Sequence, residues 1–195
     1  MRIYLPIITL LVFGISFIWS SVRVYRQTGI NPMRFGKEDN AHNYIGKVMK
    51  VIIGLLFIAV FLYAFNWKYQ YLLPMWYLES PAIAIAGLIL LHLSLVWIVY
   101  AQLSMGKSWR IGLDTENKTP LVTTGIFSLS RNPIFLGMMC CILGIFLIIP
   151  NMLTFCILLL SYFVIQIQVR LEEEFLTGQH GSSYTAYKGK VRRWL

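Results

Sequence analysis

Two groups of residues in this chain could act together on a ligand: a run of three carboxylates and a segment that contains an arginine. Glu172, Glu173 and Glu174 directly follow a long apolar stretch, and Arg131-Asn132-Pro133 directly precedes another. Carboxylates are costly at a membrane boundary, so a cluster there usually faces water, a cation or a polar cavity. Together the two groups would offer a ligand charges of both signs.

The spacing of the two groups around a turn signal predicts that they meet. Pro150-Asn151 separates two apolar stretches, which indicates a tight antiparallel helical hairpin. Arg131 lies 19 residues before Pro150, and Glu172 lies 21 residues after Asn151. At about 1.5 Å per residue, two straight helices bring them to the same depth within about one turn. The alternative is that Arg131 is an interfacial anchor and that the glutamates form a solvated helix face.

Pro133 predicts the local geometry at the start of the first hairpin helix. Proline disfavours helix at the preceding residue and is well accepted at the first helical position. The chain should therefore turn at Arg131-Asn132 and begin its helix at Pro133. The backbone amides at that helix start would be available to an anion.

The composition is typical of an integral membrane protein. Of the 195 residues, 57% are hydrophobic and only 13% are charged, too few for the surface of a soluble protein. The net charge of +9 does not indicate nucleic-acid binding, because the basic residues lie between apolar stretches and no basic tract is interleaved with aromatics. The three cysteines show no metal-ligand spacing, so no metal is expected.

Five apolar stretches approach the roughly 20 residues that a helix needs to cross a bilayer. The predicted fold is therefore an all-α polytopic membrane protein with five transmembrane helices, the last two a tight hairpin, and a helical C-terminal tail. Residues 1–195 read as one domain, in which 1–103 hold three helices and 104–195 hold a long loop, the hairpin and the tail. The stretches are Ile3 to Val22, Val48 to Phe65, Pro81 to Leu103, Pro133 to Ile149, and Asn151 to Ile167.

The distribution of basic residues predicts the orientation. With the segment after the first span placed inside, 15 of the 17 lysines and arginines lie on the cytoplasmic side, and only Arg2 and Lys68 lie outside. The N-terminus is then outside, and the C-terminus and both charged groups face the cytoplasm. We expect a bacterial or archaeal inner membrane.

Four further residues have ordinary structural interpretations. His92, inside the third span, is expected to hydrogen-bond a neighbouring helix, as lone intramembrane polar side chains do. Tyr184 and Tyr187 are expected to dock the tail beneath the hairpin. Trp109 is either an interfacial anchor or part of a substrate mouth.

Four ordered motifs resemble the isoprenylcysteine carboxyl methyltransferase family, whose wider superfamily includes the phospholipid N-methyltransferases. The resemblance covers roughly Ser104 to Leu195. The motifs are Leu121-Val122-Thr123-Thr124-Gly125-Ile126-Phe127, Arg131-Asn132-Pro133-Ile134-Phe135-Leu136-Gly137, Glu172-Glu173-Glu174-Phe175-Leu176, and Gly181-Ser182-Ser183-Tyr184-Thr185-Ala186-Tyr187.

The resemblance implies S-adenosyl-L-methionine as the methyl donor and a lipid-side tunnel for an apolar substrate. Arg131 and Glu172 would be the catalytic residues, and Gln168 and Trp109 would contact the substrate. Glu172 matches the family glutamate that meets the cofactor, and Glu173 and Glu174 would only hold the tail. The implied cofactor-binding residues are Thr119, Pro120, Leu121, Val122, Phe127, Arg131, Asn132, Pro133, Phe135 and Glu172.

Several positions depart from the family pattern. Asn132 replaces a histidine, and Phe127 and Phe135 replace tyrosines. Gln168 stands where members with prenylcysteine substrates often carry arginine, so a charge that could hold a substrate carboxylate is missing. These departures bear on the substrate more than on methyl transfer.

The expected function is methyl transfer from S-adenosylmethionine to a lipophilic acceptor at the cytoplasmic membrane face. The acceptor would be an isoprenylcysteine-like carboxylate or a related small lipophilic molecule that enters from the bilayer. Two alternatives stay open: a phospholipid amine or thiol methyltransferase, and a non-catalytic lipid-binding module of the same fold.

Overall fold

The computed structural model describes residues 2–33, 39–66, 68–113 and 117–195, and in these residues the chain is helical, without a β-strand. Arg34 and Lys37, two of the basic residues in the orientation count, lie outside the described residues. The main elements are α1 (Tyr4–Phe13), the π-helical segment η1 (Gly14–Trp19), α2 (Ser20–Thr28), α3 (Ala41–Ala64), α4 (Pro81–Met105), α5 (Pro133–Ile148), α6 (Met152–His180) and α7 (Ser182–Lys190). Short 3-10 turns cover Tyr69–Leu72, Trp76–Leu78, Gly106–Ser108 and Gly125–Ser128.

Four helical segments of the described chain are long and apolar enough to cross a membrane: Tyr4–Thr28, Ala41–Ala64, Pro81–Ser108 and Met152–His180. The expected all-α membrane architecture is thus confirmed. The fifth expected span is α5, which has only 16 residues. It is about 24 Å long, against a hydrocarbon core of roughly 30 Å, so a count of five spans stays a prediction.

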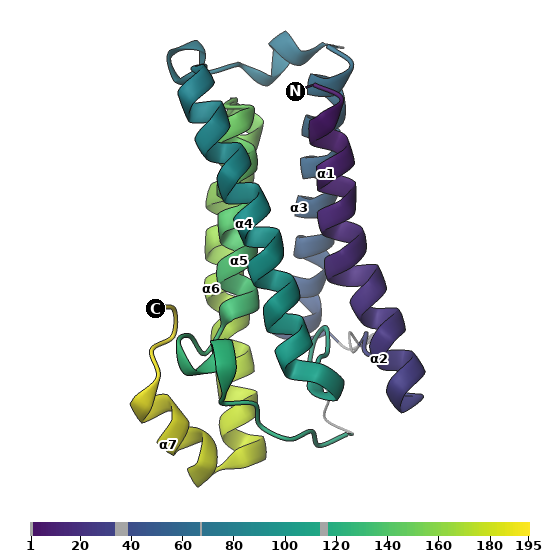
Figure 1. The fold of residues 1–195 in the computed structure, drawn as a ribbon, viewed down its shortest axis with the longest axis vertical. Helices are drawn as coiled ribbons and strands as arrows, with labels where there is room; N and C mark the ends of the chain where they lie inside the picture. The colour runs from purple at the N-terminus through teal and green to yellow at the C-terminus, as the bar shows by residue number, and fades with distance from the viewer. Residues whose placement is uncertain (1, 34–38, 67, 114–116) are drawn as a thin grey trace.

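The bundle has α4, α5 and α6 side by side, while α3 packs against α6 and α1 packs against α3 (Figure 1). Large apolar side chains such as Ile58, Phe61, Leu93, Val96 and Phe163 are exposed on its outer surface. In water such a surface would aggregate, whereas in a bilayer it faces lipid. The described molecule is therefore built for a membrane.

The predicted hairpin turn at Pro150-Asn151 is confirmed. Asn151 caps α6 by accepting a hydrogen bond from the backbone N–H of Thr154 at 2.9 Å, and the Thr154 hydroxyl accepts one from the Asn151 N–H at 3.2 Å. This reciprocal capping box satisfies backbone donors that a helix start leaves open. It fixes the point where the chain reverses.

The sixth helix continues 13 residues past the predicted end at Ile167 and reaches His180. Hydropathy marks where a span leaves the membrane, and it does not mark where the helix ends. The extension carries Gln168 and the glutamate run beyond the apolar part. The carboxylates therefore sit on a rigid helix instead of a loop.

Glycines let α4 and α5 approach closely. A Cβ atom on Gly87 would lie 2.7 Å from the backbone oxygen of Gly144, and one on Gly137 would lie 2.5 Å from a carbon of Ile98. Small residues at such a crossing allow backbone contact between membrane helices. The indole of Trp97 then donates to the carbonyl of Pro133 at 2.8 Å, which ties the start of α5 to α4.

His92 behaves as the sequence predicts. The hydroxyl of Tyr4 on α1 lies 2.5 Å from Nε2 of His92 on α4, so the histidine links two helices. At the opposite end of the bundle, α7 and the C-terminal segment fold back beside the chain that enters α5 (Figure 1). Tyr184 and Tyr187 are both buried in that contact.

Substitution of alanine for Gly144 should destabilise the bundle by about 1–3 kcal/mol, since the new methyl would lie 2.9 Å from the Gly87 backbone oxygen and force the helices apart. Thermal unfolding in detergent measures the effect. Gly54→Ala is the matched control, because a Cβ atom there meets nothing within 4 Å. Equal melting temperatures for the two variants would contradict the close α4–α5 crossing.

Candidate active site

A cavity of about 110 Å³ lies where the start of α5, the end of α6 and α7 come together. Its walls come from segments far apart in sequence: the 119–122 stretch, the turn before α5, the polar end of α6 and the two tail tyrosines. All ten residues that the resemblance implies for the cofactor line it: Thr119, Pro120, Leu121, Val122, Phe127, Arg131, Asn132, Pro133, Phe135 and Glu172. Whether they hold a cofactor stays a prediction.

The start of α5 has the predicted form. Its helix begins at Pro133, and Asn132 before it has a non-helical backbone. The hydroxyl of Ser130 accepts a hydrogen bond from the Asn132 N–H at 3.1 Å. The turn therefore holds Arg131 at the cavity wall.

Arg131 is the most unusual side chain of this cavity. Only 7% of it is exposed, and Nη2 lies 3.2 Å from the Oε1 atom of Glu173. Its Nε and Nη1 atoms are buried without a hydrogen-bond partner in the described part of the chain. Because buried guanidinium N–H groups are costly to leave unpaired, these two donors fit an anionic group in the cavity.

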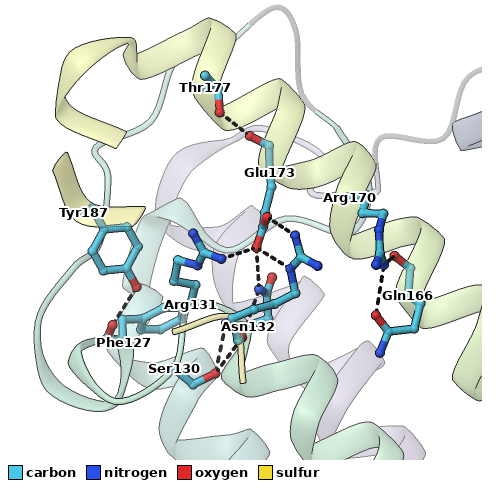
Figure 2. Close-up of polar contacts among 10 residues, drawn as sticks. Phe127, Ser130, Arg131, Asn132, Gln166, Arg170, Glu173, Thr177 and Tyr187 are labelled. Carbon is cyan, nitrogen blue, oxygen red and sulfur yellow. Dashed lines mark hydrogen bonds and ion pairs between the residues drawn. The ribbon is translucent and has the colours of Figure 1, made fainter. Parts of the chain in front are cut away.

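Glu173, and not Glu172, is the glutamate that contacts Arg131 (Figure 2). Arg193 binds the same carboxylate with two nitrogens, Nε to Oε1 at 3.1 Å and Nη2 to Oε2 at 2.9 Å. The amide of Asn132 donates to Oε1 at 3.3 Å. The hydrogen bond to Glu173 raises the pKa of Arg193 above its ordinary value.

Hydrogen bonds to backbone carbonyls of the C-terminal segment join that segment to the turn before α5. The Arg131 N–H donates to the carbonyl of Arg192 at 3.0 Å, and the Arg193 carbonyl accepts from Ser130 and Asn132, each at 3.3 Å. Glu173 thus holds the tail through Arg193, while Glu174 is exposed.

Tyr184 and Tyr187 of the tail form part of the wall of the first cavity. The hydroxyl of Tyr187 donates to the Phe127 carbonyl at 2.6 Å (Figure 2). Burial raises the pKa of Tyr187 to about 12 and raises that of Tyr184 as well, so both phenols stay protonated at neutral pH. In the structure the tail thus packs beside Phe127 through its two buried tyrosines.

A second, larger cavity of about 570 Å³ adjoins the first. Most of its lining is apolar and comes from η1, α3, α4 and α5. Both expected substrate-contacting residues, Gln168 and Trp109, line it. The residues that line both cavities are Met105, Arg110, Gly112, Ile134, Phe135 and Glu172. We call the first cavity, which contains Arg131 and Asn132 among apolar side chains, the polar cavity, and the second the apolar cavity. Glu172 is the carboxylate at their junction.

Trp109 and Gln168 differ from simple surface residues. Trp109 is only 3% exposed, so the interpretation as an interfacial anchor is wrong. Gln168 is buried, with Nε2 3.5 Å from Nδ1 of His42 and Oε1 without a partner among the described residues. The His42 ring also accepts from the Leu113 N–H at 3.2 Å.

Sequence reasoning missed several residues of the two cavities. Leu176, Gln179 and His180 line the first cavity at positions four, seven and eight after Glu172, which is one face of a helix. Extending the helix beyond the apolar stretch would have found them. Arg193 and His42 carry no comparable local signal, because their contacts join segments far apart in the chain.

The comparison with protein-family models matches the description "Phospholipid methyltransferase" over residues 82–183, which is more than half of the chain. The chain belongs to the phospholipid methyltransferase family. It is accordingly a membrane methyltransferase by family and by its apolar helical architecture. Comparison with curated proteins gives no significant match.

A solved structure shares the fold of this family member. It is the eukaryotic intramembrane Ras methyltransferase isoprenylcysteine carboxyl methyltransferase, solved without a monobody. The TM-score is 0.62 at 17% sequence identity, and the match covers 98% of this chain and 69% of that chain. The expected resemblance to these methyltransferases is confirmed at the level of family and fold.

Replacement of Arg193 by glutamine should loosen the tail, because the Glu173 carboxylate loses its two-nitrogen partner. Hydrogen exchange in residues 184–195 should rise about tenfold or more, since charge-assisted hydrogen bonds contribute about 1.5–3 kcal/mol. Mass spectrometry of exchanged peptides measures the change. Arg192→Gln is the matched control, because the Arg192 side chain is exposed and its contact to Arg131 uses backbone atoms. Equal exchange in both variants would show that Glu173 does not hold the tail.

Proposed function

We propose that this protein transfers a methyl group from S-adenosylmethionine to a lipophilic acceptor that enters from the bilayer. The observation that carries the proposal is the junction at Glu172. There the polar cavity, in which two guanidinium nitrogens of Arg131 have no partner among the described residues, meets a large apolar cavity. A charged donor and an apolar acceptor need such neighbouring compartments. Methyl transfer between them requires that the two compartments share a wall.

The polar cavity suits the donor. S-adenosylmethionine supplies an electrophilic methyl group on a sulfonium, which is a cation that cannot lose its charge by deprotonation. Its methionine end carries a carboxylate, for which Nε and Nη1 of Arg131 are available donors. Glu172 offers the negative charge that a sulfonium or an ammonium requires. Phe127 and Phe135 supply apolar ring surface to the same cavity.

Catalysis in this proposal comes from alignment. In-line displacement needs the donor sulfur, the methyl carbon and the acceptor atom on one line, so positioning dominates the rate. Arg131 and Glu172 would fix the donor, while Trp109 and Gln168 would hold the acceptor in the apolar cavity. A carboxylate or thiolate acceptor arrives charged, but an amine must lose a proton, and Glu172 at the junction is then the candidate base.

A phospholipid amine is the second candidate acceptor, beside an isoprenylcysteine-like carboxylate. Two observations favour it: the matching family model describes phospholipid methyltransferases, and the neutral Gln168 offers no charge to a substrate carboxylate. A thiol acceptor fits the same cavity. A non-catalytic lipid-binding module would not need the unpaired Arg131 donors beside Glu172.

We further propose five membrane spans, with the N-terminus outside and the site at the cytoplasmic face of a bacterial or archaeal inner membrane. α5 packs extensively on α4 and also contacts α6, so this short helix is sheltered by protein. A sheltered helix does not need the full length that lipid contact demands. The proposal includes no metal and no nucleic acid.

Binding of S-adenosylmethionine to the purified protein in nanodiscs should weaken about 10- to 100-fold in Arg131→Ala and in Glu172→Gln, because each variant loses a charge-assisted contact. Isothermal titration calorimetry measures the dissociation constants. Arg170→Gln is the control, because Arg170 is exposed on the same helix and binds Gln166 (Figure 2). Absence of binding to folded wild type would contradict the proposed function. Undiminished binding in both variants would show that the cofactor binds elsewhere.

Replacement of Gln168 by arginine should shift the acceptor preference toward carboxylates. The added guanidinium would face the apolar cavity beside Glu172 and lower the KM for a prenylcysteine analogue about tenfold. Transfer of labelled methyl groups to that analogue and to extracted membrane lipids measures the preference. Gln166→Arg, on the same helix but outside both cavities, is the control. An equal shift in the control would show that Gln168 does not contact the acceptor.

A further inference from the structure

The apolar cavity contains a buried serine whose hydroxyl has no partner. Ser16 is 3% exposed, and its Oγ atom forms no hydrogen bond within the described residues. The residue lines the second cavity and also a third one of about 80 Å³ with an almost wholly apolar lining. A hydroxyl in such surroundings is costly unless it is paired, so a polar atom of a bound molecule would be its natural partner.

A π-helical turn holds Ser16 in place. In η1 the backbone N–H of Ser20 bonds the carbonyl of Ile15, five residues back. The Gln102 amide of α4 donates to the Ser16 carbonyl at 2.7 Å and accepts from the Ser20 hydroxyl at 2.6 Å. Both the nitrogen and the oxygen of the Gln102 amide are thus hydrogen-bonded, so the amide is not a partner for the Ser16 hydroxyl. Single π turns occur frequently at functional sites.

Ser16 lies in the apolar cavity at the level of Gln102 on α4, and this level determines which part of a bound molecule it can contact. Met105, which lines both the polar and the apolar cavity, lies three residues after Gln102, or about 4.5 Å along α4. Leu91, in the third cavity, lies 11 residues before Gln102, or about 16 Å in the other direction. The hydroxyl is therefore close to the reacting end, with a long apolar space beyond it.

The second and third cavities adjoin, because they share eight lining residues, among them Ser16, Phe17, Ile98 and Met138. A molecule with a reacting head at Glu172 would pass Ser16 before its apolar chain enters the third cavity. Glycerophospholipids have this order of groups, since ester carbonyls separate the headgroup from the acyl chains. A dialkyl ether lipid keeps the shape and lacks the carbonyls.

We propose that Ser16 is a specificity-determining residue that donates a hydrogen bond to an ester carbonyl of a diacyl lipid acceptor. The inference rests on the proposed function only in assigning the apolar cavity to the acceptor. Gln102 acts as a positioning residue because its amide holds the Ser16 carbonyl, and the Ser20 hydroxyl holds that amide in turn.

The test compares two probes, dioleoyl phosphatidylethanolamine and its dialkyl ether analogue of equal chain length. Native mass spectrometry of the full chain in detergent measures the binding of each. Wild type should bind the diacyl lipid about fivefold more tightly, and Ser16→Ala should bind both lipids equally. Ser161→Ala is the matched control. Ser161 is also buried with an unpaired hydroxyl, but it lines the third cavity and not the second.

Four results would overturn the inference: equal binding of both lipids by wild type, a preference that survives in Ser16→Ala, an equal loss in Ser161→Ala, or no binding of either lipid. Binding of S-adenosylmethionine, measured on the same samples, separates this inference from the proposed function. If the protein prefers the diacyl lipid through Ser16 but binds no S-adenosylmethionine, the lipid subsite is supported and the proposed methyl donor is contradicted.

Discussion

A carboxylate removed from water requires positive partners, and the arrangement of the residues around the start of α5 and the tail follows from how Glu173 meets that requirement. Arg193 binds both oxygens of the carboxylate, and Arg131 contacts Oε1 through Nη2. If Arg193 moved away, the buried Glu173 carboxylate would lose a partner, which is energetically costly. The ion pair therefore stabilises the packed position of the tail. The Nε and Nη1 atoms of Arg131 are buried beside the cavity and have no hydrogen-bond partner in the part of the chain that the structure describes. The ion pairs of Glu173 therefore hold the tail beside the cavity, and they leave Nε and Nη1 of Arg131 available to a ligand.

The second organising feature is the division between two chemically different cavities. Charged and polar side chains such as Arg131, Asn132 and Tyr184 line the smaller one together with apolar residues, whereas the lining of the larger one is mostly apolar. Glu172 lies in the wall of both. Charged donors and apolar acceptors partition into different surroundings, so a reaction between them is suited to this boundary.

Much of this architecture could be predicted from the sequence because it depends on local properties. Runs of apolar residues marked the membrane segments, and Pro150-Asn151 and Pro133 marked the turn and the helix start. The ordered motifs of the C-terminal half identified ten residues that line one cavity. The contribution of Arg193 and the burial of Trp109 could not be predicted in this way, since both arise from packing between distant segments.

The glutamate run separates what the sequence determined from what the fold decided. Residue spacing around the hairpin turn placed the carboxylates and Arg131 at the same depth, because helical rise is fixed at about 1.5 Å per residue. Depth does not specify direction, however, and neighbouring residues on a helix point about 100° apart. The packing of α6 against α5 and the tail turns Glu173 toward Arg131 and leaves Glu172 at the junction of the cavities. Only the tertiary structure could assign the two glutamates, since that rotation depends on contacts with the rest of the bundle.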